Sequence, residues 1–128
     1  YPSRTYCALE ENSYIYKHPE KFSIKLPFNH HLYWETIDGA NNYPTRLKRC
    51  KVFEEKCYKL GIEIDCGVKT STELDEWYNL GNYYEFKGDL KEAFNYFSKY
   101  MEKNPADKIV QQKVLKLKAK LEVSTINI

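Results

Sequence analysis

Several side chains near the N-terminus are of types that perform chemistry, and their spacing limits what they can do together. His30 and His31 are adjacent, so on a strand they would point to opposite faces and could not act on one site. His31, Tyr33 and Glu35 would share one face, a geometry compatible with acid and base chemistry or with weak metal binding. A surface strand that carries polar residues explains the same pattern without any chemistry.

The longer signatures of catalysis are missing from the sequence. It contains no Gly-rich phosphate loop, no G-x-S-x-G elbow and no H-E-x-x-H helix. A nucleophile pair of Cys7 with a distant histidine has no local signature to support it. We therefore expect no catalytic residues, no cofactor and no enzymatic activity.

The cysteines form an even set, which fits either two disulfides or four buried thiols: Cys7, Cys50, Cys57 and Cys66. Cys50 and Cys57 would lie about 10 Å apart along one helix, beyond the reach of a disulfide. We favour the pairs Cys57–Cys66 and Cys7–Cys50, with four reduced core cysteines as the alternative. Pairing would favour a secreted, periplasmic or lumenal protein and reduced thiols a cytoplasmic one, so the compartment stays open. Close ligand pairs such as C-x2-C are absent, so no metal site is expected.

Length and composition bound the class of protein. A chain of 128 residues suffices for one compact domain or two small lobes, and twelve Tyr, six Phe and two Trp exclude a disordered chain. The net charge of +2 is too small for wholesale phosphate neutralisation, so nucleic acid is not the expected partner. No stretch approaches the ~20 apolar residues of a membrane span, and residues 1–30 lack the order of a secretory signal. We expect a soluble chain.

The first 43 residues are predicted to form an aromatic-rich arm with a short β-hairpin. Residues 22–26 alternate apolar and polar side chains, which is typical of a half-buried strand. Residues 32–37 have the aromatic and β-branched content of a second strand, and residues 27–31 would connect the two as a loose hairpin. Four of the five prolines fall in the first 44 residues, which argues against helix in this arm.

An apolar stripe predicts a helix from Pro44 to Leu60. Its members recur every three or four residues: Leu47, Cys50, Phe53, Cys57 and Leu60. Pro44 suits the first helical turn and Gly61 suits a C-terminal cap. The other face is basic and carries Arg46, Lys48, Arg49, Lys51, Lys56 and Lys59. A solvated face explains these charges, and the alternative is a groove for an acidic peptide or a phosphate backbone.

A spaced motif between residues 77 and 105 determines the expected architecture. It reads W-x2-L-G-x2-Y, then A-x3-F, then P, at Trp77, Leu80, Gly81, Tyr84, Ala93, Phe97 and Pro105. The first four share one helical face, and the next two share a face one helix later. Gly81 and Ala93 are small enough to let two antiparallel helices come close together, with Gly88-Asp89 as the reversal between them.

This pattern resembles the tetratricopeptide repeat (TPR), as a single copy at about residues 74–107. Proteins of that family hold a partner's peptide or helix on the surface made by the first helix of each hairpin. The resemblance implies partner-binding residues at Tyr78, Asn79, Asn82, Tyr83 and Phe86. The alternative is that Tyr83 and Phe86 are buried by a flanking helix. Tyr100 departs from the family pattern, which has a small residue there, and this implies a looser or locally customised junction with the next helix.

A lone hairpin cannot bury both faces, so flanking helices must cover it. The segment after Pro105 predicts a capping helix with an apolar stripe of Ile109, Val110, Val114, Leu117 and Leu121. Its lysines are predicted on the opposite side, at Lys113, Lys116, Lys118 and Lys120. The helix from Pro44 would cover the other side of the hairpin.

The expected fold is mainly α, of the α+β type: an arm with a β-hairpin over residues 1–43, and a helical TPR-like domain over residues 44–128. The expected function is non-enzymatic binding of another protein or a peptide through the TPR-like surface. The alternative is binding of nucleic acid or an anionic surface through the basic helix faces.

Overall fold

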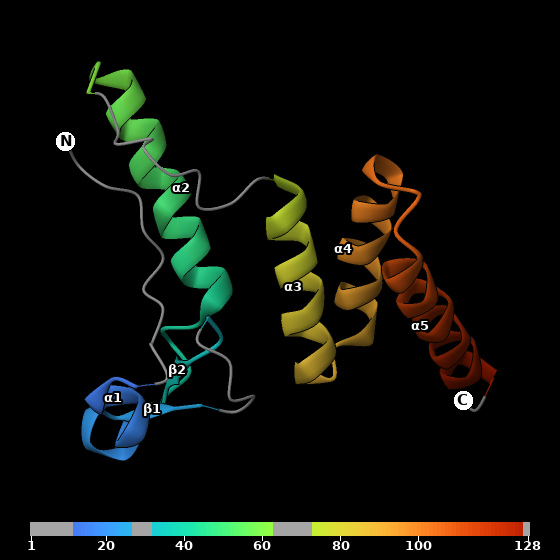
Figure 1. The fold of residues 1–128 in the computed structure, drawn as a ribbon, viewed down its shortest axis with the longest axis horizontal. Helices are drawn as coiled ribbons and strands as arrows, with labels where there is room; N and C mark the ends of the chain where they lie inside the picture. Colours follow the sequence, from blue (N-terminus) through green and yellow to red (C-terminus); the bar gives the residue numbers. More distant parts are fainter. Residues whose placement is uncertain (1–11, 27–31, 63–72, 127–128) are drawn as a thin grey trace. The chain divides into compact units, whose positions relative to one another are not determined.

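The computed structural model describes residues 12–26, 32–62 and 73–126 (Figure 1). Helix dominates, and the elements are α1 (Tyr14–Lys17), the 3₁₀ helix η1 (Pro19–Phe22), α2 (Tyr43–Lys59), α3 (Glu73–Lys87), α4 (Leu90–Lys103) and α5 (Lys108–Ile126). The strands β1 (Ile24–Lys25) and β2 (Glu35–Thr36) pair in one small antiparallel sheet. The predicted class, mainly helical with a small β element, is confirmed.

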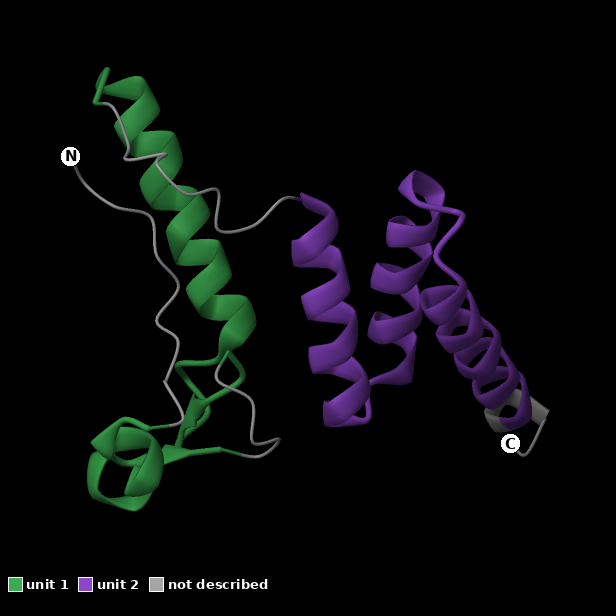
Figure 2. Cartoon of the chain, in the orientation of Figure 1, with its two compact units in different colours: residues 1–70 green, residues 71–128 purple. Residues whose placement is uncertain are grey.

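The chain divides into two compact units, residues 1–70 and residues 71–128 (Figure 2). The prediction placed the boundary between residues 43 and 44, whereas the structure keeps α2 with the arm. The reason is Arg46 of α2, whose guanidinium carbon lies 3.9 Å from the ring centroid of Trp34. The same guanidinium donates a hydrogen bond of 2.6 Å to the carbonyl oxygen of Leu32.

The predicted hairpin of the arm is present but shorter than expected. Ile24 pairs with Thr36 and Lys25 pairs with Glu35. The predicted connection, residues 27–31, lies outside the described residues. The two strands therefore form a sheet only two residues long, which lies beside the N-terminal end of α2 (Figure 1).

The expectation that the arm contains no helix is wrong for α1 and η1. Ser13 caps α1, because its hydroxyl oxygen accepts a 3.2 Å hydrogen bond from the N–H of Tyr16. Pro19 then opens η1, where its fixed φ is tolerated in the first turn. Phe22 belongs to this 3₁₀ turn and not to the predicted strand.

Local signals set both ends of α2, and its predicted bounds are confirmed to within one residue. The side chain of Asn42 accepts a 3.0 Å hydrogen bond from the N–H of Thr45 at the start of the helix. Gly61 takes φ +69° after the last turn, and the N–H of Ile62 bonds back to the carbonyl oxygen of Cys57 at 2.9 Å. This is a glycine-dependent helix end.

The packed face of α2 is rotated from the predicted stripe. Leu47 and Cys57 are buried as predicted, but Phe53 and Leu60 are 43% and 73% exposed. Arg46, assigned from the sequence to the solvated basic face, is only 7% exposed. The prediction followed apolar residues alone, so it missed a face that the flat guanidinium of Arg46 completes by stacking on an aromatic ring.

In the second unit α3, α4 and α5 lie side by side in chain order (Figure 1). Gly88, at φ +82°, and Asp89 make the reversal between α3 and α4, as predicted. The Asp89 carboxylate caps α4 by accepting a 3.2 Å hydrogen bond from the N–H of Glu92. The core of this unit consists of Ala93, Phe97, Val110 and Leu117, all at most 2% exposed.

α3 and α4 pack closely at Gly81. A Cβ atom on this residue would lie 2.7 Å from Cε1 of Phe97, and the three nearest heavy atoms all belong to that ring. The glycine therefore makes room for an aromatic side chain one helical turn beyond Ala93, and not for Ala93 itself. Ala93 is fully buried in the core cluster that α4 forms with α5.

The capping helix α5 begins at Lys108 and packs its apolar side on α4. Val110 and Leu117 are buried and Val114 packs against them, as predicted. Ile109, placed in the same stripe by the sequence, is exposed. Lys113 is half-buried instead of fully outward: its ammonium lies 3.2 Å from Oε1 of Glu85 on α3 and 5.5 Å from the ring centroid of Phe97.

Candidate functional site

The predicted partner-binding role of Tyr78 needs a side chain that faces outward from α3. The Tyr78 ring instead packs against α4. It meets Phe97 edge-on, with centroids 6.2 Å apart, and approaches Tyr100 at 5.8 Å. Tyr78 precedes Gly81 by three residues, so the two share the side of α3 that packs on α4. Substitution of Tyr78 would therefore remove ring contacts with two residues of α4.

Tyr83 and Phe86 have different environments. Tyr83 is 5% exposed, with its ring edge-on to Tyr84 at 5.2 Å and Lys87 Nζ 5.7 Å from its centroid. The alternative interpretation, a buried side chain, therefore holds for Tyr83. Phe86, at the C-terminal end of α3, is 50% exposed.

Three of the predicted residues keep solvent-exposed area and lie on one side of α3 together with Asp75. We call this side the α3 face: Asp75, Asn79, Asn82 and Phe86. They are spaced by four, three and four residues, so they follow one stripe of the helix. Asp75 and Phe86 are exposed, and the two asparagines are half-buried. Asp75 was missed from the sequence, although its spacing of four residues to Asn79 is the signal that would have found it.

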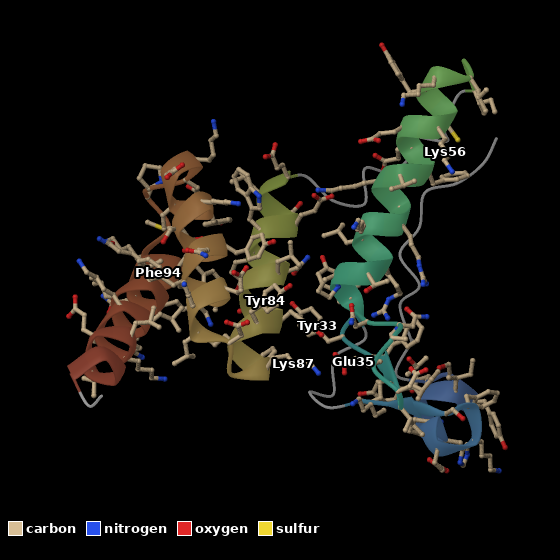
Figure 3. The ribbon with its side chains drawn as sticks, turned by 180° about the vertical axis from the view of Figure 1, so that it is seen from behind. Tyr33, Glu35, Lys56, Tyr84, Lys87 and Phe94 are labelled. Carbon is tan, nitrogen blue, oxygen red and sulfur yellow. The ribbon has the colours of Figure 1, made fainter. Side chains whose placement is uncertain are left out.

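The remaining motif residues are structural. Trp77 is half-buried and Leu80 is buried on α3, and Pro105 is exposed just after α4. Tyr84, labelled in Figure 3, stacks on Tyr96 of α4 with parallel rings and centroids 5.7 Å apart. Burial is the main cause that raises the pKa of the Tyr84 hydroxyl above its ordinary value, and the neighbouring Tyr96 adds to the shift. These residues position the α3 face and do not form part of it.

Tyr100, which departs from the repeat pattern, organises the junction between α4 and α5. Its hydroxyl donates a 2.8 Å hydrogen bond to Oδ2 of Asp107 and accepts one of 3.1 Å from the side-chain amide of Asn104. The other carboxylate oxygen of Asp107 accepts hydrogen bonds from the N–H groups of Ile109 and Val110, at 3.1 and 3.2 Å. Asp107 thus caps α5 while its other carboxylate oxygen is bonded to α4.

This junction predicts a pH-dependent contribution to stability. The hydrogen bond from Tyr100, followed by the one from the N–H of Val110, lowers the pKa of the Asp107 carboxyl. A carboxyl whose pKa is lower in the folded than in the unfolded protein stabilises the fold above its unfolded pKa, near 3.9, and this contribution is lost as the pH falls through the folded value. We expect Asp107→Asn to lower the thermal midpoint at pH 7 and to have no effect near pH 2.

The measurement is the difference in thermal midpoint between wild type and variant, followed by circular dichroism from pH 7 to pH 2. Glu102→Gln on the exposed side of α4 is the control and should leave a difference near zero throughout. A difference for Asp107→Asn that does not change with pH would contradict the assigned role of this carboxylate.

The candidate chemical cluster of the arm is packed away from solvent. Tyr33 and Glu35 are 2% and 1% exposed, so this is not the polar surface strand that the sequence suggested (Figure 3). Tyr33 meets Tyr43 edge-on at 5.4 Å, and Lys25 Nζ lies 3.6 Å from Oε2 of Glu35. His31 lies outside the described residues. Within the described ranges, no group of three or more His, Cys, Asp or Glu side chains is placed to hold a metal ion.

Two of the four cysteines belong to the described part of the chain. Cys57 is buried and Cys50 is half-buried, and they are not joined to each other, as their separation on α2 requires. Cys7 and Cys66 lie outside the described residues, so both proposed disulfide pairings stay predictions.

No family model, no curated protein and no solved structure matches the chain. Among the helices that the structure describes, none combines the length and the apolar character that a membrane crossing needs.

Proposed function

We propose that this chain is a non-enzymatic protein-interaction module with a TPR-like helix pair, and that its α3 face binds an extended segment of another protein or peptide. The observation that carries the proposal is the packing of the Phe97 ring over Gly81. This contact fixes one side of α3 against α4 and leaves the α3 face on another side of the helix.

The TPR-like assignment is supported by the agreement between the motif and the packing. The ring of Phe97 packs against Gly81, and Ala93 is fully buried; all three belong to the motif. The helix pair is followed by α5, which covers the other side of α4. A layer of three helices in this order is what one repeat with a capping helix would form.

The chemistry of the α3 face suits a peptide backbone. Asn79 and Asn82 lie about 4.5 Å apart along the helix axis, and each amide can both donate and accept hydrogen bonds. An extended chain offers alternating N–H and C=O groups to such a pair. Phe86 adds exposed apolar area at one end, and Asp75 adds a carboxylate at the other.

The alternative is that the basic helix faces bind a phosphate backbone. Two of the basic side chains assigned to those faces make contacts within the fold instead. Arg46 is bonded within the first unit and Lys113 is paired with Glu85 within the second. Phosphate contacts need cations that are free to meet the solvent. The structure of the basic faces therefore favours protein binding over nucleic-acid binding.

The proposal is tested by selecting peptides that bind the wild-type chain from a random twelve-residue library. We expect the selected peptides to bind Asn82→Ala/Phe86→Ala at least tenfold more weakly, because the double variant removes one amide and the apolar end of the α3 face. Affinities are measured by fluorescence anisotropy, and circular dichroism shows that the variant is folded.

The matched control is Asn95→Ala, an exposed amide on α4 away from the α3 face. It should leave the affinities unchanged. Selected peptides that bind the folded double variant as tightly as the wild type would refute the α3 face as the binding surface. Tyr78 is not used in this test because its ring packs on Phe97.

A further inference from the structure

Two tyrosines from neighbouring helices of the second unit lie with their rings parallel. The planes of Tyr84 on α3 and Tyr96 on α4 are inclined by only 1°, and the ring centroids are 5.7 Å apart. This distance is typical of offset stacking, in which the facing edges of the two rings lie closer together than their centroids. Both residues are half-buried, so each keeps some area that is accessible to a small solute. The pair is therefore aligned by the fold and can also be reached from the solvent.

The surroundings of this pair hold the rings and keep Tyr84 protonated. The Lys99 ammonium lies 5.2 Å from the centroid of the Tyr96 ring, within the range of a cation–π contact. Burial is the main cause that raises the pKa of the Tyr84 hydroxyl, and the neighbouring Tyr96 and two nearby carboxylates add to the shift. This hydroxyl keeps its proton at neutral pH, so its oxidation has to remove a proton as well as an electron.

Other tyrosine pairs in the described part of the chain are less well arranged to react with each other. Tyr33 and Tyr43 are each 2% exposed, and their ring planes are inclined by 75°. Tyr78 and Tyr100 lie on the same two helices as the stacked pair, with centroids 5.8 Å apart, but their planes are inclined by 50°. The Tyr100 hydroxyl is also hydrogen-bonded at the junction between α4 and α5. Access and parallel alignment thus come together at Tyr84 and Tyr96.

We propose that Tyr84 and Tyr96 are an oxidative modification site, at which a one-electron oxidant joins the two rings as dityrosine. Two equivalents of the oxidant take one electron from each phenol, and each phenol releases its hydroxyl proton to the solvent. The two phenoxyl radicals then couple by forming a bond between one Cε atom of each ring. The hydrogen on each bonded Cε moves to the phenoxyl oxygen, which restores both aromatic rings. The product has lost two hydrogen atoms in total.

The fold favours a link within one chain over a link between two chains. The stacked rings are held next to each other by facing helices, so their effective concentration far exceeds a micromolar concentration of chains. The bond would join α3 to α4 across the reversal at Gly88 and restrict how far the two helices can separate. The site lies apart from the α3 face and does not rest on the proposed binding function.

The test oxidises the full chain at micromolar concentration with persulfate and a ruthenium photosensitiser, and then digests the monomer completely with trypsin. Cleavage after lysine leaves Tyr96 as the single tyrosine of peptide 92–99, and Tyr84 in peptide 70–87. We expect these two peptides to be joined, with a mass two hydrogen atoms below their sum and with the fluorescence of dityrosine. A link through Tyr78 and Tyr100 would instead join peptide 70–87 to peptide 100–103.

Phenylalanine variants keep each ring and remove the hydroxyl group that the oxidation needs. Tyr84→Phe and Tyr96→Phe should each lower the yield of the expected linked peptides by about tenfold or more, because the aligned pair is lost. Tyr83→Phe distinguishes Tyr84 from its sequence neighbour and should leave the yield unchanged. Tyr58→Phe is the control for exposure alone, because it removes a tyrosine of the first unit that is 87% exposed, and it should also have no effect. Circular dichroism shows that each variant is folded.

Oxidation of the chain unfolded in urea tests whether the fold directs the reaction. Unfolding separates the two helices, so the links should spread over other tyrosines and the expected peptide pair should become a minor product. The same yield in urea as in buffer would overturn the proposal. So would a product that consists mainly of cross-linked dimers, a predominant link to peptide 100–103, or an unchanged yield in Tyr84→Phe.

Discussion

Replacing Phe97 with alanine is expected to lower the free energy of unfolding of the unit formed by residues 71–128 by about 3–5 kcal/mol. The side chain is fully buried and lies in the core cluster of α4 and α5. On its other side the ring fills the space above Gly81, where α3 has no side chain. The cavity would therefore be bounded by both neighbouring helices. Urea denaturation followed by circular dichroism at 222 nm measures the change.

The control for this experiment is Phe86→Ala on the exposed end of α3, where we expect a change within about 0.5 kcal/mol. A further variant tests the contact itself. Gly81→Ala alone should destabilise the unit, because its Cβ would lie 2.7 Å from the Phe97 ring. In the Phe97→Ala background the same change should be neutral or stabilising, since the ring is gone and alanine favours helix. Equal effects of Gly81→Ala in both backgrounds would contradict the observed packing.

The positions of the helices could be predicted because short-range chemistry marks them. Gly61 and Gly88 take positive φ at helix ends, and Asp89 caps the next helix. Pro44 fits the first turn of α2. Each of these signals acts within a few residues, so it is visible in the sequence without knowledge of the tertiary structure. The same applies to the motif spacing that placed Gly81, Ala93 and Phe97 in the packed helix pair.

The side on which a residue lies was harder to predict where polar or amphipathic side chains complete a core. Arg46 and Lys113 were assigned to solvated faces, but each lies over an aromatic ring and bonds to another element. Tyr78 was assigned to a binding groove, although its ring packs on the core. Such side chains have both an apolar part and a polar end, and tertiary contacts decide which part is buried.

This difference affected the candidate site directly. Of the five residues predicted for partner binding, Tyr78 and Tyr83 are occupied by packing, and the other three remain on the α3 face. Phe53 is 43% exposed, although in the sequence it fits the pattern of the buried stripe.

The arginine that joins α2 to the arm gives the second large expected effect. Arg46→Ala should destabilise the first unit by about 2–4 kcal/mol, because it removes several interactions of one nearly buried side chain. They include the hydrogen bonds to the carbonyl of Leu32 at 2.6 Å and to Oδ1 of Asn41 at 3.2 Å, and the contact with the Trp34 ring. The intrinsic fluorescence of Trp34 during urea unfolding, in a Trp77→Phe background, measures the effect.

Two further substitutions separate the shape of this side chain from its charge. Arg46→Lys keeps the positive charge but cannot donate in two fixed directions while stacking flat on a ring, so it should recover less than half of the lost stability. Arg49→Ala removes an arginine from the exposed side of the same helix and should cost less than about 0.5 kcal/mol. Full recovery by lysine would show that charge alone holds α2 to the arm. An equal loss for Arg49→Ala would show that the buried contacts of Arg46 are not its cause.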